Sequence, residues 1–164
     1  MNETYYEIMI EKKKSPVMKF AGIATAVMAV IFLIISVLGI LWGLLLAIVS
    51  GMASYFINLF NSVEYEYLYI DKELQIDRIL AKNSRKRMET LDLKELEVLA
   101  PIRSHELDRY RNQSMKKTDY SSGDDSQNVQ KYMLVISGKQ IIFEPTLEMV
   151  KTIQMFAPRK VFTY

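Results

Sequence analysis

Residues 20–60 read FAGIATAVMAVIFLIISVLGILWGLLLAIVSGMASYFINLF, a stretch of 41 residues without one charged side chain. As a single helix it would be about 60 Å long at about 1.5 Å per residue, about twice the hydrocarbon thickness of a bilayer. Tilting does not absorb a difference of that size. The stretch therefore predicts a hairpin of two transmembrane helices, residues 18–38 and 43–60, with a turn between Gly39 and Gly43.

Small residues recur at helical spacing on both predicted helices, which favours close packing of the pair, although small residues are common in any membrane helix. They are Ala21, Gly22, Thr25, Ala26 and Ala29 in the first helix and Gly43, Ala47 and Gly51 in the second. A re-entrant loop is disfavoured, because its turn would leave backbone groups without partners in hydrocarbon. The stretch contains no acidic, basic or histidine residue, which argues against an ion or proton pathway.

Four lysines precede the apolar stretch and its central turn has no charge, which predicts that both termini are cytoplasmic and that the chain is a multi-pass protein of the plasma membrane. The apolar run is much longer than the core of a cleavable signal peptide. For the N-terminal segment, residues 1–17, two structural interpretations are open. It is either an interfacial helix whose lysines meet anionic lipid, or a tail whose lysines only fix the topology.

About 100 residues follow the hairpin, and residues 61–164 are enough for one small cytoplasmic domain. The chain has no cysteine, which excludes disulfides and thiolate nucleophiles. From Asn61 onward 17 Lys and Arg face 16 Asp and Glu. A chain so close to balance does not suggest a nucleic acid partner, which requires a net basic surface.

Alternating polar and apolar residues after the hairpin predict a mainly β domain. The first alternation, residues 63–70, places Tyr65, Tyr67 and Tyr69 on one face, which favours a core face over a stacking platform for ligands. A C-terminal helix, residues 146–157, carries the apolar stripe Leu147, Val150 and Ile153. The expected strands are residues 63–70, 73–79, 87–92, 96–100, 117–121, 131–137 and 139–143. Seven strands followed by one helix predict a pleckstrin-homology-like barrel capped by that helix.

Five short motifs carry a resemblance to a known group of proteins: VEYEY at 63–67, SHEL at 104–107, DYSSG at 119–123, FEP at 143–145 and PRK at 158–160. With these the chain resembles uncharacterised bacterial two-pass membrane proteins with a cytoplasmic pleckstrin-homology-like domain. The resemblance implies a fold and a topology, and no activity. Members of the wider fold that bind phosphoinositides use basic residues around the first strand–strand loop, whereas this chain has the short acidic turn Asp71-Lys72-Glu73.

Candidate chemistry is sparse in the sequence. His105 is the only histidine, and Glu106 and Asp108 beside it are too close along the chain for a good metal site. Ser121 or Ser122 could form a triad with His105 and Asp119 on paper, but no nucleophile turn is visible. We therefore expect no catalytic residue, metal site or cofactor.

Two functions remain open. The chain is either a non-enzymatic binding or scaffold module that docks a cytoplasmic or membrane protein partner, or a sensor of anionic lipid headgroups at the bilayer surface. The residues expected to meet headgroups are Lys12, Lys13, Lys14, Lys82, Arg85, Lys86 and Arg87.

Topology reporters fused at Met1 and at Tyr164 should both report a cytoplasmic location, because the lysines flank only the outer ends of the hairpin. Enzymatic activity of an external reporter at either terminus would contradict the two-pass topology.

Overall fold

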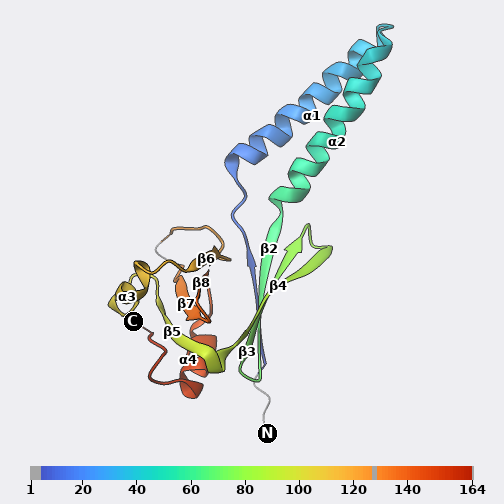
Figure 1. The fold of residues 1–164 in the computed structure, drawn as a ribbon. Coiled ribbons are helices and arrows are strands. Elements are labelled where there is room, and N and C mark those ends of the chain that lie inside the picture. Colours follow the sequence, from blue (N-terminus) through green and yellow to red (C-terminus); the bar gives the residue numbers. More distant parts are fainter. Residues whose placement is uncertain (1–4, 127–128, 164) are drawn as a thin grey trace. The chain divides into compact units, whose positions relative to one another are not determined.

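The computed structural model describes residues 5–126 and 129–163, which form two compact units (Figure 1). One unit is a helical hairpin, residues 13–63, together with the short turn at residues 80–83. The other is a β unit that contains residues 5–12, 64–79 and 84–163. The β unit thus begins before the hairpin, and the expected domain 61–164 leaves out its first strand.

The hairpin consists of α1 (Pro16–Val37) and α2 (Leu41–Asn61), both long and apolar enough to cross a membrane. These are the two helices expected from residues 18–38 and 43–60. Pro16 begins α1 in the first turn, where its missing N–H has no partner to lose. Gly39 turns the chain between the helices with φ of 97°, a conformation that a side chain disfavours.

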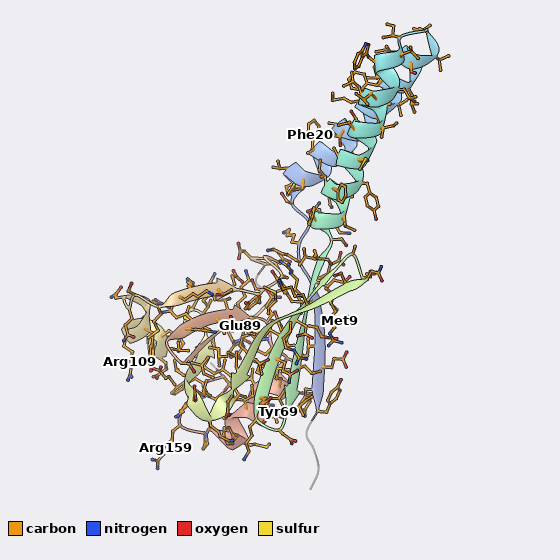
Figure 2. All side chains as sticks on the ribbon, turned by 45° about the vertical axis from the view of Figure 1, so that its right-hand side comes forward. Met9, Phe20, Tyr69, Glu89, Arg109 and Arg159 are labelled. Carbon is orange, nitrogen blue, oxygen red and sulfur yellow. The ribbon has the colours of Figure 1, made fainter. Side chains whose placement is uncertain are left out.

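Small residues bring the two helices together. A Cβ atom on Gly43 would lie 2.8 Å from the backbone nitrogen of Ser36, so only glycine fits at this crossing. Ser54 Oγ donates a hydrogen bond of 2.9 Å to the carbonyl of Gly22. Gly51 faces open space and has no such role. Large apolar side chains project outward along both helices, as around Phe20 in Figure 2.

The first sheet has the order β1-β2-β3-β4. Its strands are β1 (Tyr6–Glu11), β2 (Val63–Ile70), β3 (Glu73–Leu80) and β4 (Ser84–Asp92). β1 pairs antiparallel with β2, from Tyr6 opposite Tyr69 to Glu11 opposite Glu64. The interfacial helix is therefore wrong for residues 6–11. Tyr6, Ile8 and Ile10 alternate with polar or exposed neighbours, which is the period of a strand.

The second sheet has the order β5-β7-β8-β6. Its strands are β5 (Leu96–Pro101), β6 (Lys116–Asp119), β7 (Tyr132–Ile136) and β8 (Lys139–Phe143). A 3₁₀ turn, η1 (Leu93–Glu95), leads from β4 into it. Within the described residues there are eight strands in two separate sheets, so the expected seven-stranded closed barrel is not confirmed.

Aromatic side chains fill the space between the sheets, where the rings of Tyr67 and Phe143 meet at 5.5 Å. The tyrosines of β2 thus form a core face, as the alternation predicted. The C-terminal helix α4 (Leu147–Phe156) is confirmed, but it buries Met149, Val150 and Ile153, whereas Leu147 is 54% exposed.

A 3₁₀ turn and a short helix cover the opposite face of the second sheet. Val98, Met133, Val135 and Ile142 pack there against Leu107 and Tyr110. These two residues come from a 3₁₀ turn, η2 (His105–Leu107), and from the short helix α3 (Asp108–Arg111). Both faces of the second sheet are therefore buried.

Replacing residues 13–62 by a short Asn-Gly turn should give a soluble β unit that is more stable than the fragment 61–164. The linked protein keeps β1 on β2, and antiparallel neighbours can be joined by a two-residue loop. We expect a gain on the order of 2 kcal/mol in the free energy of unfolding, about what one buried apolar side chain contributes. Urea denaturation of both proteins measures it, and equal midpoints would show that β1 is dispensable.

Candidate functional site

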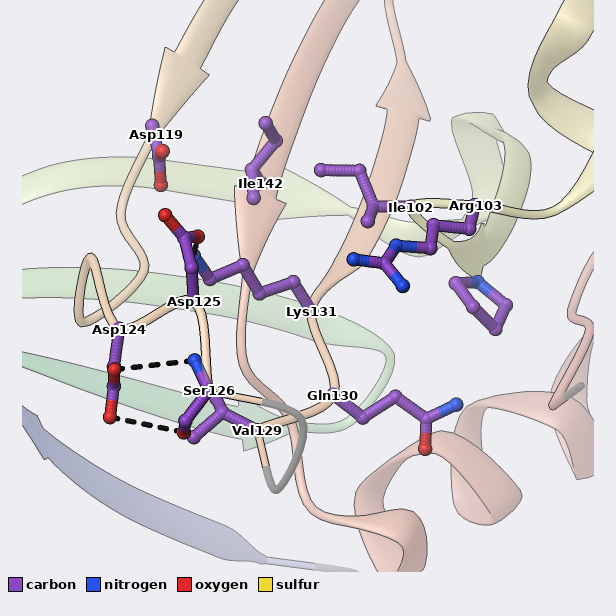
Figure 3. Close-up of a pocket in the computed structure, with 11 residues that line it drawn as sticks. Ile102, Arg103, Asp119, Asp124, Asp125, Ser126, Val129, Gln130, Lys131 and Ile142 are labelled. Carbon is purple, nitrogen blue, oxygen red and sulfur yellow. Dashed lines mark hydrogen bonds and ion pairs between the residues drawn. The ribbon is translucent and has the colours of Figure 1, made fainter.

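A cavity of about 790 Å³ opens at the edge of the second sheet, where three connections of the chain meet (Figure 3). Its apolar lining comes from Pro101, Ile102, Val129 and Ile142. Its charged and polar lining comes from Arg103, Asp119, Asp124, Asp125, Ser126, Gln130 and Lys131. An apolar floor with a few charged groups around it is the usual composition of a ligand or peptide pocket.

Hydrogen bonds and an ion pair hold several of the charged side chains of the pocket in place. The Lys131 ammonium lies 2.6 Å from Asp125 Oδ1, and this hydrogen bond raises the pKa of Lys131 and keeps it charged. The Asp124 carboxylate accepts hydrogen bonds from the backbone nitrogen and the hydroxyl of Ser126 (Figure 3). Arg103 points into the opening from the other side and is exposed. The pocket therefore presents one accessible cation opposite a carboxylate wall.

A buried polar network fixes the chain that forms the carboxylate wall. Glu144, only 7% exposed, accepts hydrogen bonds from the nitrogen and the hydroxyl of Ser122, at 3.1 and 2.8 Å. The Tyr67 hydroxyl donates to the carbonyl of Tyr120 at 2.7 Å and accepts from the nitrogen of Glu144. Burial raises the pKa of Tyr67 far above its usual range, so it remains a donor. The motifs DYSSG and FEP thus meet in space and act structurally.

The residues considered for a Ser-His-Asp catalytic triad form hydrogen bonds with other groups. Ser122 is bonded to Glu144, and Asp119 accepts from the nitrogen of Ser121 at 2.8 Å. His105 is fully exposed and pairs with Asp108 at 3.3 Å. Among residues 5–126 and 129–163, no group of three potential metal-ligating side chains comes together.

Two of the seven predicted headgroup residues support buried carboxylates. Arg85 Nε lies 2.8 Å from Asp77 Oδ2, and Arg87 Nε lies 3.2 Å from Asp77 Oδ1. Arg85 also pairs with Glu66, and both carboxylates are less than 5% exposed. Desolvation raises the pKa of Glu66, and a hydrogen bond shared with Glu7 raises it further. Sequence reasoning missed this cluster, although Glu66 alternates with the tyrosines and so had to face the other side of β2.

The remaining predicted lysines are exposed. Lys82 belongs to the turn between β3 and β4, and Ala81 beside it donates a 2.8 Å hydrogen bond to the carbonyl of Ser62, directly after α2. Lys86 is exposed on β4, three residues beyond that turn. Lys12 lies 5.8 Å from the ring centroid of Tyr65. Lys13 and Lys14 lie in the connection between β1 and α1.

Comparison with known proteins gives one match. A family model described as a bacterial PH-like domain (DUF6106) matches residues 2–163. No curated protein and no solved structure matches the chain.

Changing Tyr67→Phe should destabilise the β unit by about 1–3 kcal/mol, because the carbonyl of Tyr120 and the nitrogen of Glu144 lose their buried partner. Tyr69→Phe is the matched control. Tyr69 lies on the same face of β2, is 4% exposed and has no hydrogen-bond partner for its hydroxyl among the described residues. Denaturation of the linked β unit measures both variants, and equal losses of stability would contradict a role for the network.

Proposed function

The chain belongs to the bacterial PH-like domain family, and from this premise we propose that it is a non-enzymatic two-pass membrane protein whose cytoplasmic domain docks a partner protein. The family has no assigned activity that could be carried over to this chain. The proposal therefore rests on the helices, the strand pairing and the pocket.

The pairing of β1 with β2 supports a two-pass topology. β1 precedes α1 and β2 follows α2, yet the two strands pair over six residues. Paired strands occupy one compartment, so the chain must return to the side of the membrane from which it left. The lysines at positions 12, 13, 14 and 19 favour the cytoplasm as that side, and hence the plasma membrane as the location.

The pocket in Figure 3 is the observation that carries the docking function. Its floor of Ile102, Val129 and Ile142 can bury an apolar side chain of an extended partner segment. Arg103 can pair with a carboxylate of that segment, because its guanidinium is exposed at the opening. Ser122 and His105 are engaged in ordinary hydrogen bonds, which favours binding over catalysis.

A sensor of anionic headgroups is the second candidate function. The turn at residues 80–83 is part of the same compact unit as the helices, and Ala81 is bonded to Ser62. Lys82 on this turn, with Lys86 beyond it, would gain about 1 kcal/mol per residue from anionic lipid at the cytoplasmic surface. Arg85 and Arg87 contribute less to this function, since they are paired with carboxylates.

Two variants of the full chain, which lower its net charge by four and by three respectively, should separate the candidates. We expect a stoichiometric partner to co-purify from native membranes solubilised in mild detergent with the unchanged chain and with Lys82→Glu/Lys86→Glu. Arg103→Glu/Val129→Asp should lose this partner, since it places two negative charges in the opening of the pocket.

The contrary outcome is equally specific. If no partner co-purifies, and the linked β unit binds vesicles of anionic lipid in a manner that Lys82→Glu/Lys86→Glu abolishes, then the lipid sensor is the function. Loss of the partner in both variants would show that net charge, and not the pocket, holds it.

A further inference from the structure

A second hollow of about 260 Å³ lies where α4 ends, beside the η1 turn. Its floor is apolar and consists of Leu93, Phe156, Ala157 and Pro158. Its remaining lining residues are Lys94, Arg159 and Lys160, so three cations and no carboxylate surround it. Figure 2 shows Arg159 projecting from the surface of the β unit.

The turn between β2 and β3 adds a fourth cation, Lys72, which stands between the two carboxylates of Asp71 and Glu73 in the sequence. The Lys72 ammonium lies 4.8 Å from the centroid of the Phe156 ring, within the range of a cation–π contact. The carbonyl of Lys72 accepts a 2.8 Å hydrogen bond from the nitrogen of Leu93, which ties the turn to the floor of the hollow. The four cations thus come from three separate segments of the chain. We call this surface the basic groove.

Basic residues after a helix can simply offset the negative end of its dipole. That explanation covers Arg159 and Lys160, but it does not cover Lys72 and Lys94, which come from other segments. The carbonyls of Ile153 and Ala157 already accept hydrogen bonds from Ala157 and Lys160. A helix end carries about half a charge, so the three cations that line the hollow leave its lining positive.

Carboxylates adjoin these cations in the sequence, at Asp71, Glu73, Asp92 and Glu95, but none of them lines the hollow. Asp92 lies 3.7 Å from the Lys94 ammonium, but both side chains are well exposed, and such surface pairs contribute little. An incoming carboxylate can therefore compete for Lys94. Arg159 offers a planar guanidinium that suits bidentate pairing with a carboxylate.

We propose that the basic groove docks an acidic segment of a partner protein, with one bulky apolar side chain in the hollow and flanking carboxylates on Lys94, Arg159 and Lys160. This surface is separate from the pocket of Figure 3, with which it shares no lining residue. It goes beyond the proposed function by giving the domain a second partner site. A protein segment is favoured over a lipid because the hollow has room for one bulky apolar side chain.

The test uses the full chain in nanodiscs of phosphatidylcholine, which has no net charge. The probe is a dye-labelled peptide of glutamates that flank a central leucine–phenylalanine pair, and fluorescence anisotropy measures its binding. A second peptide has serines in place of the apolar pair. Arg159→Glu/Lys160→Glu is the groove variant. Lys116→Glu/Lys117→Glu on β6 is the control, because it changes the net charge equally at another exposed site.

We expect saturable binding of the apolar peptide that the groove variant weakens at least about tenfold, or about 1.4 kcal/mol. The control variant should stay within about twofold, and the serine peptide should bind at least about tenfold more weakly. Thermal unfolding of both variants at the temperature of the unchanged chain verifies their folds.

Three results would overturn the proposal. One is equal weakening in the groove and control variants, which means attraction by net charge alone. Another is equal binding of the serine peptide, which leaves the hollow without a role. The third is the absence of saturable peptide binding, including the case in which short-chain phosphatidylglycerol binds the groove instead. These outcomes do not bear on the pocket of Figure 3, whose own variants test it.

Discussion

The antiparallel ladder between β1 and β2 is the constraint on which the rest of the structure depends. It pairs the strand before the hairpin with the strand after it, so that the chain enters α1 from one strand and continues from α2 into the neighbouring strand. Ladder hydrogen bonds fix the register of Tyr6, Ile8 and Ile10 against the tyrosines of β2. With that register, one face of the sheet becomes the core, and the carboxylates of Glu7 and Glu66 meet on the other.

On the opposite face of the same sheet, buried carboxylates pair with some of the basic residues that follow β3, while other basic residues remain exposed. Burying Glu66 and Asp77 would be costly without partners. Arg85 and Arg87 supply those partners from β4. The basic run at residues 82–87 therefore has two parts, an exposed pair at Lys82 and Lys86 and a structural pair that belongs to the sheet. A count of positive charges in the sequence does not distinguish them.

The sequence was sufficient for features that depend on local pattern. The apolar run, the alternation of Tyr65, Tyr67 and Tyr69, and the C-terminal helix α4 all have short-range signatures. Features that depend on distant pairing were not predictable. β1 is short, and its partner lies more than 50 positions away, so the sequence left only a helix or a tail as interpretations and the strand was missed. The parallel pairing of β6 with β8 and the pocket of Figure 3 arise only when separate connections converge. Likewise, Leu147 fits the apolar stripe but lies at the exposed start of its helix.

The β1–β2 ladder has a consequence for how the chain is made. Glu11 pairs with Glu64 and Tyr6 with Tyr69, so β1 is synthesised 53 to 63 residues before its partners. At about 5–20 residues per second, β1 remains an unpaired strand for several seconds while the apolar stretch leaves the ribosome. The sheet can close only after the hairpin has been completed and both its ends lie in one compartment. If the two helices cross a membrane as proposed, a chain with a misinserted helix would keep its two strands on opposite sides of the bilayer and would expose an unfolded domain to proteases. Closure of the ladder would then require correct insertion of both helices.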